Sequence, residues 1–229
     1  MFIYLLIILV FWEGTAEANK MCDVSSHRTC FPSDYFGVPT NEEELNKACP
    51  IFLETMECLK TYAQTCGEDE IDYTFSLETH QKLIDFAKEI CRKDSEIHLK
   101  VVENIGCINS AIKDKENKCK DSTSSKMDKL ENYINELEKN QVEASGYRLD
   151  EWRSYSCLHH SLGVACNIAK IQERCGSEAK HLTMQLIDKS GFVEDFCQPP
   201  LREDSRELIQ ILELEMEEEN GLKEVLYNE

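Results

Sequence analysis

The segment CLHHSLGVACNIAKIQERCG, residues 157–176, decides the fold class, because its apolar residues recur at helical spacing between its cysteines. Steps of three or four residues place apolar side chains on one face of a helix. The glycine after the third cysteine suits the left-handed position that ends many helices. We therefore expect a helix from about Asp150 to Cys175. Its apolar positions are Trp152, Leu158, Leu162, Ala165 and Ala169.

A second segment, CPIFLETMECLKTYAQTCG at residues 49–67, resembles the first. Its three cysteines are separated by eight and seven residues, against eight and eight in residues 157–176, and glycine again follows the third cysteine. A fourth cysteine follows after 24 intervening residues in this set and after 21 in the other. This similarity predicts two related helical hairpins. Cys107 and Cys119 have no counterparts in it.

Helical spacing continues along the rest of the chain, and no stretch alternates as a strand would. The expected class is all-α, a disulfide-stapled helical bundle. In the helix around residues 49–67 the apolar positions are Leu45, Ala48, Phe52, Met56, Leu59 and Ala63. Further helices are expected from Ser76 to about Cys91, over 97–112 with Asp94 or Ser95 as cap, over 127–137 and over 177–190.

Local signals set the ends of these helices. Thr40 followed by Glu43 predicts a capping box, and Pro50 predicts a kink or a break into two helices. The polar stretch 113–125 predicts a loop or frayed end, and Pro199-Pro200 should close the helical region. An acidic C-terminal helix is expected from about Ser205, with fraying near Asn220-Gly221.

Twelve cysteines lie beyond residue 18, and an even number in a secreted chain predicts a disulfide framework. A zinc site is less favoured, because zinc cysteines stand two to four residues apart and the tightest spacing here has seven residues between. The cysteines are Cys22, Cys30, Cys49, Cys58, Cys66, Cys91, Cys107, Cys119, Cys157, Cys166, Cys175 and Cys197.

Helix geometry restricts how these cysteines can pair. Nine residues along a helix rise about 13.5 Å, whereas a disulfide requires Cα atoms within about 7 Å. Cys49 therefore cannot bond to Cys58, nor Cys157 to Cys166, within continuous helices. The bridges are expected to join different helices, and the remaining pairings stay open.

The N-terminus predicts secretion. An apolar run from Phe2 to Trp12 is followed by Ala16-Glu17-Ala18, the order of a signal peptide with a small-residue cleavage site. The run is shorter than the roughly 20 residues that span a bilayer. Cleavage is expected between Ala18 and Asn19, and no later segment is long and apolar enough to act as an anchor.

Charge restricts the partners. Loss of Glu13 and Glu17 with the signal peptide changes the net charge from −19 to −17. Such an acidic chain is repelled by nucleic acids and anionic membrane surfaces, so charged partners should be basic. The expected organisation is a signal peptide at 1–18, an extension with two cysteines at 19–40, a disulfide-rich helical domain at 41–200 and an acidic helix or tail at 201–229.

The sequence offers little catalytic chemistry. His159 and His160 are adjacent, so on a helix they point about 100° apart and cannot easily share a metal. We expect one to face the core and the other solvent. Catalytic motifs and phosphate-binding glycine loops do not occur. We expect a non-enzymatic protein without metal or cofactor, and a solvated face for the glutamates at 213–219.

Three stretches carry a resemblance to secreted cysteine-rich helical proteins of arthropods. Glu57-Cys58-Leu59, Ile84-Asp85-Phe86 and Glu103-Asn104-Ile105-Gly106-Cys107 resemble the 27 kDa haemolymph glycoprotein family. The many-cysteine centipede venom peptides, the scoloptoxins, are similar in general construction. The resemblance covers roughly residues 49–197 and implies an extracellular helical protein with no catalytic residue.

Two functions follow as expectations. The first is a secreted binding protein, such as an arthropod venom toxin, that acts on a protein target such as a channel or receptor. The second is an extracellular haemolymph carrier that encloses a small apolar ligand.

Overall fold

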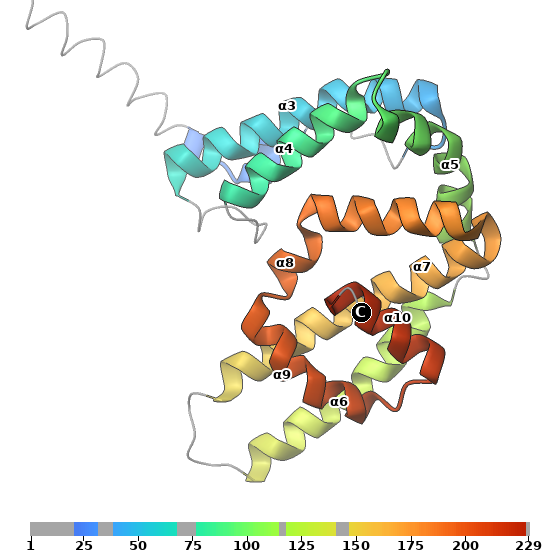
Figure 1. Cartoon of the computed structure of the whole chain (residues 1–229). Coiled ribbons are helices and arrows are strands. Elements are labelled where there is room, and N and C mark those ends of the chain that lie inside the picture. The colour runs from blue at the N-terminus through green and yellow to red at the C-terminus, as the bar shows by residue number, and fades with distance from the viewer. Residues whose placement is uncertain (1–20, 32–38, 68–76, 115–117, 141–146, 228–229) are drawn as a thin grey trace, which may run out of the picture. The chain divides into compact units, whose positions relative to one another are not determined.

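The computed structural model describes residues 21–31, 39–67, 77–114, 118–140 and 147–227. All regular structure in these ranges is helical, which confirms the all-α prediction (Figure 1). The chain divides into two compact units, Met1–His98 and Leu99–Glu229. The predicted signal peptide and its cleavage site at Ala18 and Asn19 lie outside the described residues.

Unit 1 is built on two long helices that lie side by side, α3 (Glu42–Cys66) and α4 (Leu77–Cys91) (Figure 1). A short helix, α2 (Ser26–Cys30), packs on α3, and the first turn of α5 (Glu96–Lys113) completes the unit. The predicted helix to Cys91 is therefore confirmed.

The start of α3 differs from the prediction by one residue. Asn41, not Thr40, is the N-cap, and its side-chain oxygen accepts a hydrogen bond from the Glu44 backbone N–H at 3.0 Å. The Glu44 carboxylate accepts bonds from both the N–H and the hydroxyl of Thr40, each at 2.8 Å. Glu44, and not Glu43, thus bonds to Thr40, the residue that precedes the cap.

Pro50 does not break α3, so the alternative of two separate helices is wrong. Proline removes one backbone hydrogen bond, but tertiary contacts hold the turns around it. Leu45 is buried on the turn before, and Cys49 is buried and bonded to Cys91. Local propensity is a weak determinant when packing fixes both sides of the interruption.

The core of unit 1 uses part of the predicted apolar face. Leu59 and Ala63 are buried, as predicted, but Phe52 is 36% exposed. Tyr62, which the pattern does not select, is almost fully buried and donates a hydrogen bond from its hydroxyl to the Val24 carbonyl at 3.0 Å. A buried tyrosine needs such a partner, and this bond ties the N-terminal segment to α3.

A tight turn connects α4 to α5. Ser95 caps α5, since its hydroxyl accepts a bond from the His98 backbone N–H at 3.1 Å and donates to the Glu89 carbonyl at 2.7 Å. The ring nitrogen Nδ1 of the buried His98 lies 2.7 Å from the Ile90 carbonyl. Of the two predicted caps, Asp94 and Ser95, the structure selects Ser95.

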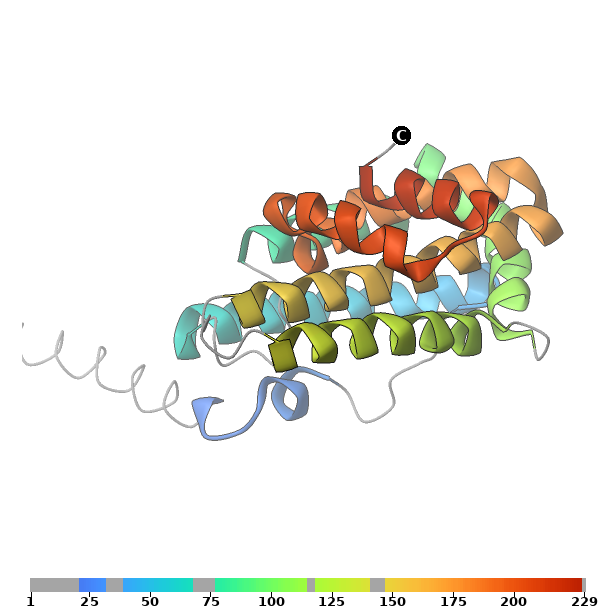
Figure 2. The ribbon, with the colours of Figure 1, turned by 90° about the horizontal axis from the view of Figure 1, so that it is seen from below.

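Unit 2 is centred on α7 (Tyr147–Ser190), which packs against α6 (Cys119–Asn140), α8 (Phe192–Phe196), α9 (Pro199–Ile209) and α10 (Met216–Tyr227). Figure 2 shows the first half of α7 between α6 and the C-terminal helices. One apolar core joins all these elements. Its fully buried members are Met127, Leu130, Ile134, Cys157, Leu158, Cys197, Leu212, Leu222 and Leu226.

The predicted loop at 113–125 is wrong over its second half. Residues 119–125 form the first two turns of α6. Cys119 is buried and bonded to Cys166 on α7, and Thr123 is also buried. These contacts outweigh the low helix propensity of the Ser and Thr residues.

The C-terminal segment packs as part of unit 2, and the predicted fraying near Asn220-Gly221 is wrong. Pro199 and Pro200 open α9, because the first turn of a helix tolerates residues without a backbone N–H. A short 3₁₀ helix, η2 (Gln210–Leu212), follows, and α10 then runs through Asn220 and Gly221. Burial of Leu222, Val225 and Leu226 in the core of unit 2 stabilises α10.

Two glycines interrupt the long helices where the sequence predicts. Gly67 follows α3 with φ 108° and ψ 148°, and Gly176 divides α7 with φ 86° and ψ 179°. Both have the positive φ of a helix end, but ψ is extended instead of left-handed helical. This backbone region is accessible almost only to glycine.

Replacing Gly176 by alanine is expected to lower the free energy of unfolding of unit 2 by roughly 1–3 kcal/mol. No atom would lie within 4 Å of the added methyl group, so the cost comes from the backbone alone. The control is Gly163→Ala, inside the helical part of α7 and equally uncrowded, where alanine should stabilise by roughly 0.5–1 kcal/mol. Urea denaturation of both variants measures this, and effects of the same sign would contradict the prediction.

Candidate functional site

All twelve cysteines form disulfide bonds, so the sulfur atoms constitute the chemical framework of the molecule. No cysteine remains as a thiol. The pairs are Cys22–Cys66, Cys30–Cys58, Cys49–Cys91, Cys107–Cys175, Cys119–Cys166 and Cys157–Cys197.

The pairing satisfies the limit set by helix geometry. The Cα–Cα distances range from 4.9 Å for Cys157–Cys197 to 5.9 Å for Cys107–Cys175, within the span of a disulfide. No bridge joins cysteines on the same helix, which confirms the prediction that Cys49 does not bond to Cys58 nor Cys157 to Cys166.

In unit 1 the three bridges attach neighbouring segments to α3. Cys30 on α2 bonds to Cys58 near the middle of α3, and Cys22 bonds to Cys66 at its last residue. Cys49 near the start of α3 bonds to Cys91 at the end of α4. The framework therefore fixes α3 at both ends and in the middle.

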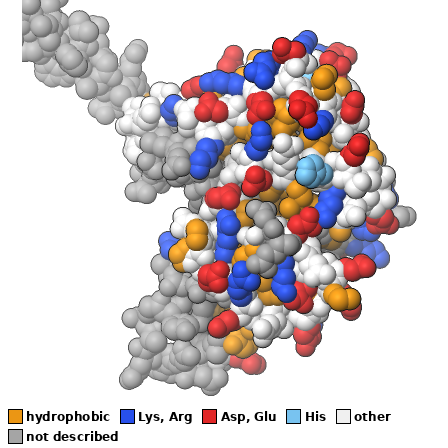
Figure 3. All heavy atoms as spheres, in the orientation of Figure 1, with side chains coloured by type: hydrophobic (Ala, Val, Ile, Leu, Met, Phe, Trp, Pro, Cys, Tyr) orange, Lys and Arg blue, Asp and Glu red, His pale blue; other side chains and the backbone are white. Residues whose placement is uncertain are grey.

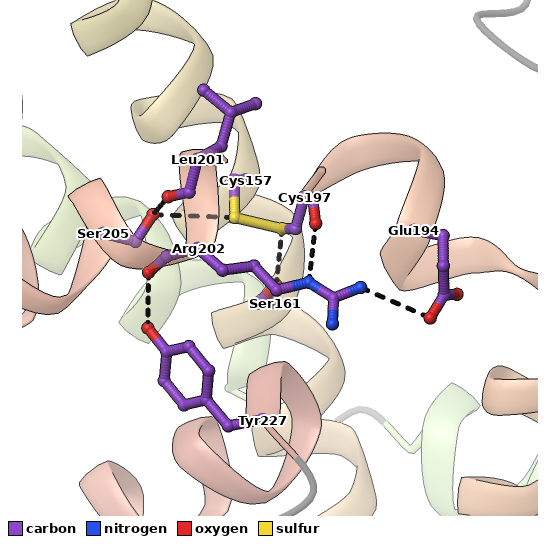
Figure 4. The surroundings of a disulfide bond; sticks show 8 residues. All are labelled: Cys157, Ser161, Glu194, Cys197, Leu201, Arg202, Ser205 and Tyr227. Carbon is purple, nitrogen blue, oxygen red and sulfur yellow. Dashed lines mark hydrogen bonds and ion pairs between the residues drawn. A yellow bond between two sulfur atoms is a disulfide. The ribbon is translucent and has the colours of Figure 1, made fainter. Parts of the chain in front are cut away.

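In unit 2 the Cys157–Cys197 bridge is the most deeply enclosed, with both residues 0% exposed (Figure 4). Two buried hydroxyls flank the sulfur atoms. Ser161 Oγ lies 3.4 Å from Cys197 Sγ, and Ser205 Oγ donates to the Leu201 carbonyl at 2.6 Å while lying 3.7 Å from Cys157 Sγ. This bridge joins α7 to the segment that leads into α9.

Arg202 on α9 connects the disulfide to the C-terminal helix (Figure 4). Its Nε donates to the Cys197 carbonyl at 2.6 Å, and its Nη2 lies 3.3 Å from Glu194 Oε1. The Tyr227 hydroxyl donates to the Arg202 carbonyl at 2.7 Å, and the Arg206 guanidinium stacks 3.9 Å from the centre of the Tyr227 ring. These contacts hold the end of α10 against α9.

The chain has no match to any family model, curated protein or solved structure. Its two disulfide frameworks therefore have to be interpreted from their own geometry. The resemblance to the arthropod proteins remains a hypothesis based on the three sequence stretches that suggested it.

The histidine pair differs from the prediction of one core-facing and one solvated ring. Both rings are partly buried and belong to a row of aromatic contacts. His159 stacks on Tyr155 with centroids 6.4 Å apart, and His160 packs on Phe196 at 4.3 Å. The two histidine rings meet edge to face at 5.4 Å. Burial, and then the neighbouring charge of His159, lower the pKa of His160.

Unit 2 is expected to lose stability as the pH falls below about 6.5, the ordinary pKa of histidine. The unfolded chain binds the His160 proton at higher pH than the folded chain, so falling pH favours unfolding until the lower folded-state pKa is passed. His160→Gln should remove this part of the pH dependence, measured by urea denaturation at pH 8 and pH 5. The exposed His181→Gln serves as control, and an unchanged pH dependence in His160→Gln would contradict the assignment.

Two of the five glutamates at 213–219 form ion pairs with lysines of α6. Lys129 lies 2.7 Å from Glu213, and Lys126 lies 2.7 Å from Glu218. The hydrogen bond and charge of Lys129 lower the pKa of Glu213. The prediction of a solvated face holds for four of the five, whereas Glu219 is partly buried. The exposed ones are Glu213, Glu215, Glu217 and Glu218. Exposed pairs of this kind contribute little to stability.

In the described ranges no three His, Cys, Asp or Glu side chains are grouped so that they could hold a metal ion. Within the same ranges no helix combines the length and apolar character needed to cross a membrane.

Proposed function

We propose that this chain is a secreted, non-enzymatic protein that acts by binding a protein target such as a channel or receptor, in the manner of a venom toxin. The observation that carries the proposal is the pairing of all twelve cysteines on a helical scaffold. Such frameworks form and persist outside the reducing cytosol. They keep a binding surface rigid, which reduces the entropy lost on association.

The chemistry of the described side chains favours binding over catalysis. Every cysteine sulfur is in a bridge, so no cysteine thiolate serves as a nucleophile or metal ligand. The His159–His160 pair is engaged in ring contacts with Tyr155 and Phe196. These groups stabilise the fold of unit 2.

Surface charge indicates the kind of partner. Acidic and basic side chains are intermingled over the face shown in Figure 3, while the whole chain carries a net charge of −19. A negative total charge accelerates encounter with a basic surface and slows encounter with nucleic acid or an anionic membrane. A target with a basic outer face fits best.

The alternative is an extracellular carrier of a small apolar ligand. Unit 2 contains a hollow lined by apolar residues of α7 and α10, together with Asp188, Glu194 and Arg202, but its volume is about 20 Å³. Ligand pockets are usually of the order of 300–1,000 Å³, and this hollow is large enough for about one water molecule. This hollow is therefore too small to hold a small apolar ligand of ordinary size.

Secretion is tested first. Expression of residues 1–229 in insect cells should deliver the protein to the medium with Asn19 as its first residue, as determined by N-terminal sequencing. Ala18→Arg is the matched variant, because a bulky charged residue at the cleavage position should prevent processing. Retention of the unchanged chain in the cells with an intact N-terminus would contradict the proposed signal peptide.

The binding function is then tested with the oxidised mature protein on a panel of ion channels and receptors. A reversible change in current or signalling that disappears after reduction of the disulfides is the expected result. Native mass spectrometry and organic extraction of the same preparation test the alternative. A stoichiometric lipid, with no response from the panel, would favour the carrier and contradict the toxin proposal.

A further inference from the structure

The two units share one disulfide pattern. Each contains six of the twelve cysteines, and no bridge joins one unit to the other. Numbered along the chain within a unit, the first cysteine pairs with the fifth, the second with the fourth and the third with the sixth, in both units. The prediction that Cys107 and Cys119 lack counterparts is therefore wrong, because they occupy the places of Cys22 and Cys30.

Chance explains this agreement poorly. Six cysteines can pair in 15 ways, but the third, fourth and fifth lie on one helix in each unit and cannot bond to one another, which leaves six. An unrelated second set would therefore reproduce the first pattern in about one case in six. The absence of any bridge between the units adds a second condition that both sets satisfy.

The backbone repeats with the cysteines. In each unit one continuous helix carries the third, fourth and fifth cysteines, on α3 in unit 1 and on the first half of α7 in unit 2. A glycine with positive φ follows the fifth cysteine, at Gly67 and at Gly176. A second helical segment then leads toward the sixth cysteine, at Cys91 and at Cys197. The same sequence of turns and bridges thus occurs twice.

The differences between the units also fit a shared module. Unit 2 has 37 residues between its second and third cysteines, which include α6, where unit 1 has 18. Unit 2 also continues after its sixth cysteine into α9 and α10. Both additions cover apolar surface on α7.

The positions of α7 that are buried under other helices correspond to exposed positions on α3. Counted from the third cysteine of each unit, the buried Leu158 and Leu162 of α7 correspond to Pro50 and Glu54 of α3, and both α3 residues are exposed. The described part of unit 1 contains no counterpart of α6, α9 or α10, and Pro50 and Glu54 are uncovered there. The side chains at these positions are thus apolar where other helices cover them and exposed where none does.

We infer that the chain is a tandem duplication of one six-cysteine helical module with the pairing first–fifth, second–fourth and third–sixth. Each copy is a separately stabilised domain, closed by its own three disulfides. The unit boundary at His98 and Leu99 lies at the start of α5, so the chain leaves the first module after its last bridge and enters the second before its first.

The test uses the full secreted chain and two equivalent double variants. Cys30→Ala/Cys58→Ala removes the second–fourth bridge of unit 1, and Cys119→Ala/Cys166→Ala removes the same bridge of unit 2. Hydrogen exchange with peptide resolution should show amide exchange faster by roughly 30-fold or more in the unit that lost its bridge. Exchange in the other unit should change less than about two-fold.

Peptide mapping of the unreduced wild-type protein provides a second measurement that does not depend on variants that fold. It should identify the six disulfides given above, three in each unit, with the pairing first–fifth, second–fourth and third–sixth in both. A bridge between a cysteine before His98 and one after Leu99, or a different order in the two units, would overturn the duplication. Faster exchange in both units after loss of one bridge would overturn their independence.

Discussion

Replacing Leu222 by aspartate should lower the free energy of unfolding of unit 2 by about 4 kcal/mol or more. Leu222 lies in the middle of α10 and is 0% exposed within the core of unit 2. The substitution removes a large apolar side chain and buries a carboxyl group that has no partner. Because α10 packs on α7, its release would also expose the core that α7 shares with α6.

The matched control is Met216→Asp in the same helix. Met216 is 76% exposed and occupies the first turn of α10, where a negative charge is favourable. The free energy of unfolding of unit 2 in the Met216→Asp variant should remain within about 0.5 kcal/mol of the wild-type value. Trp152 is the only tryptophan after residue 18 and belongs to unit 2, so its fluorescence during urea denaturation reports on this unit. Equal effects of the two variants would show that α10 is not part of the core.

Removing the Cys157–Cys197 bridge by the double variant Cys157→Ala/Cys197→Ala should destabilise unit 2 by about 4 kcal/mol. The bridge closes a loop with a sequence separation of 40 residues, and its loss increases the conformational entropy of the unfolded chain. Loss of the buried sulfur atoms adds to the effect, because both sites are enclosed and a cavity would remain.

The control for this variant is the equivalent bridge of unit 1. Cys49→Ala/Cys91→Ala opens a loop with a sequence separation of 42 residues, so the entropic effect is of the same size. It should leave the urea transition of Trp152 unchanged, because Cys49 and Cys91 belong to the other unit. A shift of that transition as large as the one caused by the first variant would contradict the prediction.

The sequence predicted the helices better than their ends. Apolar spacing gave the helix that includes Leu158 and Leu162, because burial on one face enforces the helical period. In the C-terminal segment it predicted a helix from about Ser205, but it missed that α10 continues through Gly221 to the buried Leu222 and Leu226. Pro199 was misinterpreted because a proline that ends one helix and a proline that begins the next look alike in sequence.

The sequence excluded some cysteine pairs but did not show which of the remaining pairs form. Helix rise excluded bridges between cysteines nine residues apart, and that conclusion holds. The choice among the remaining pairs depends on which helices lie side by side, which spacing does not specify. The repeat of the pattern was concealed because the segments between the second and third cysteines have 18 and 37 residues.

The unequal burial of the sulfur atoms implies an order of attack by small thiols such as glutathione. Thiol–disulfide exchange requires direct access to a sulfur atom. Cys107 lies at the surface, so the Cys107–Cys175 bridge should open first in unit 2, whereas Cys157–Cys197 is shielded from reagents until the helices around it separate. In a mildly reducing fluid the Cys107–Cys175 bridge, which attaches α5 to α7, would therefore open while the buried Cys157–Cys197 bridge stayed intact.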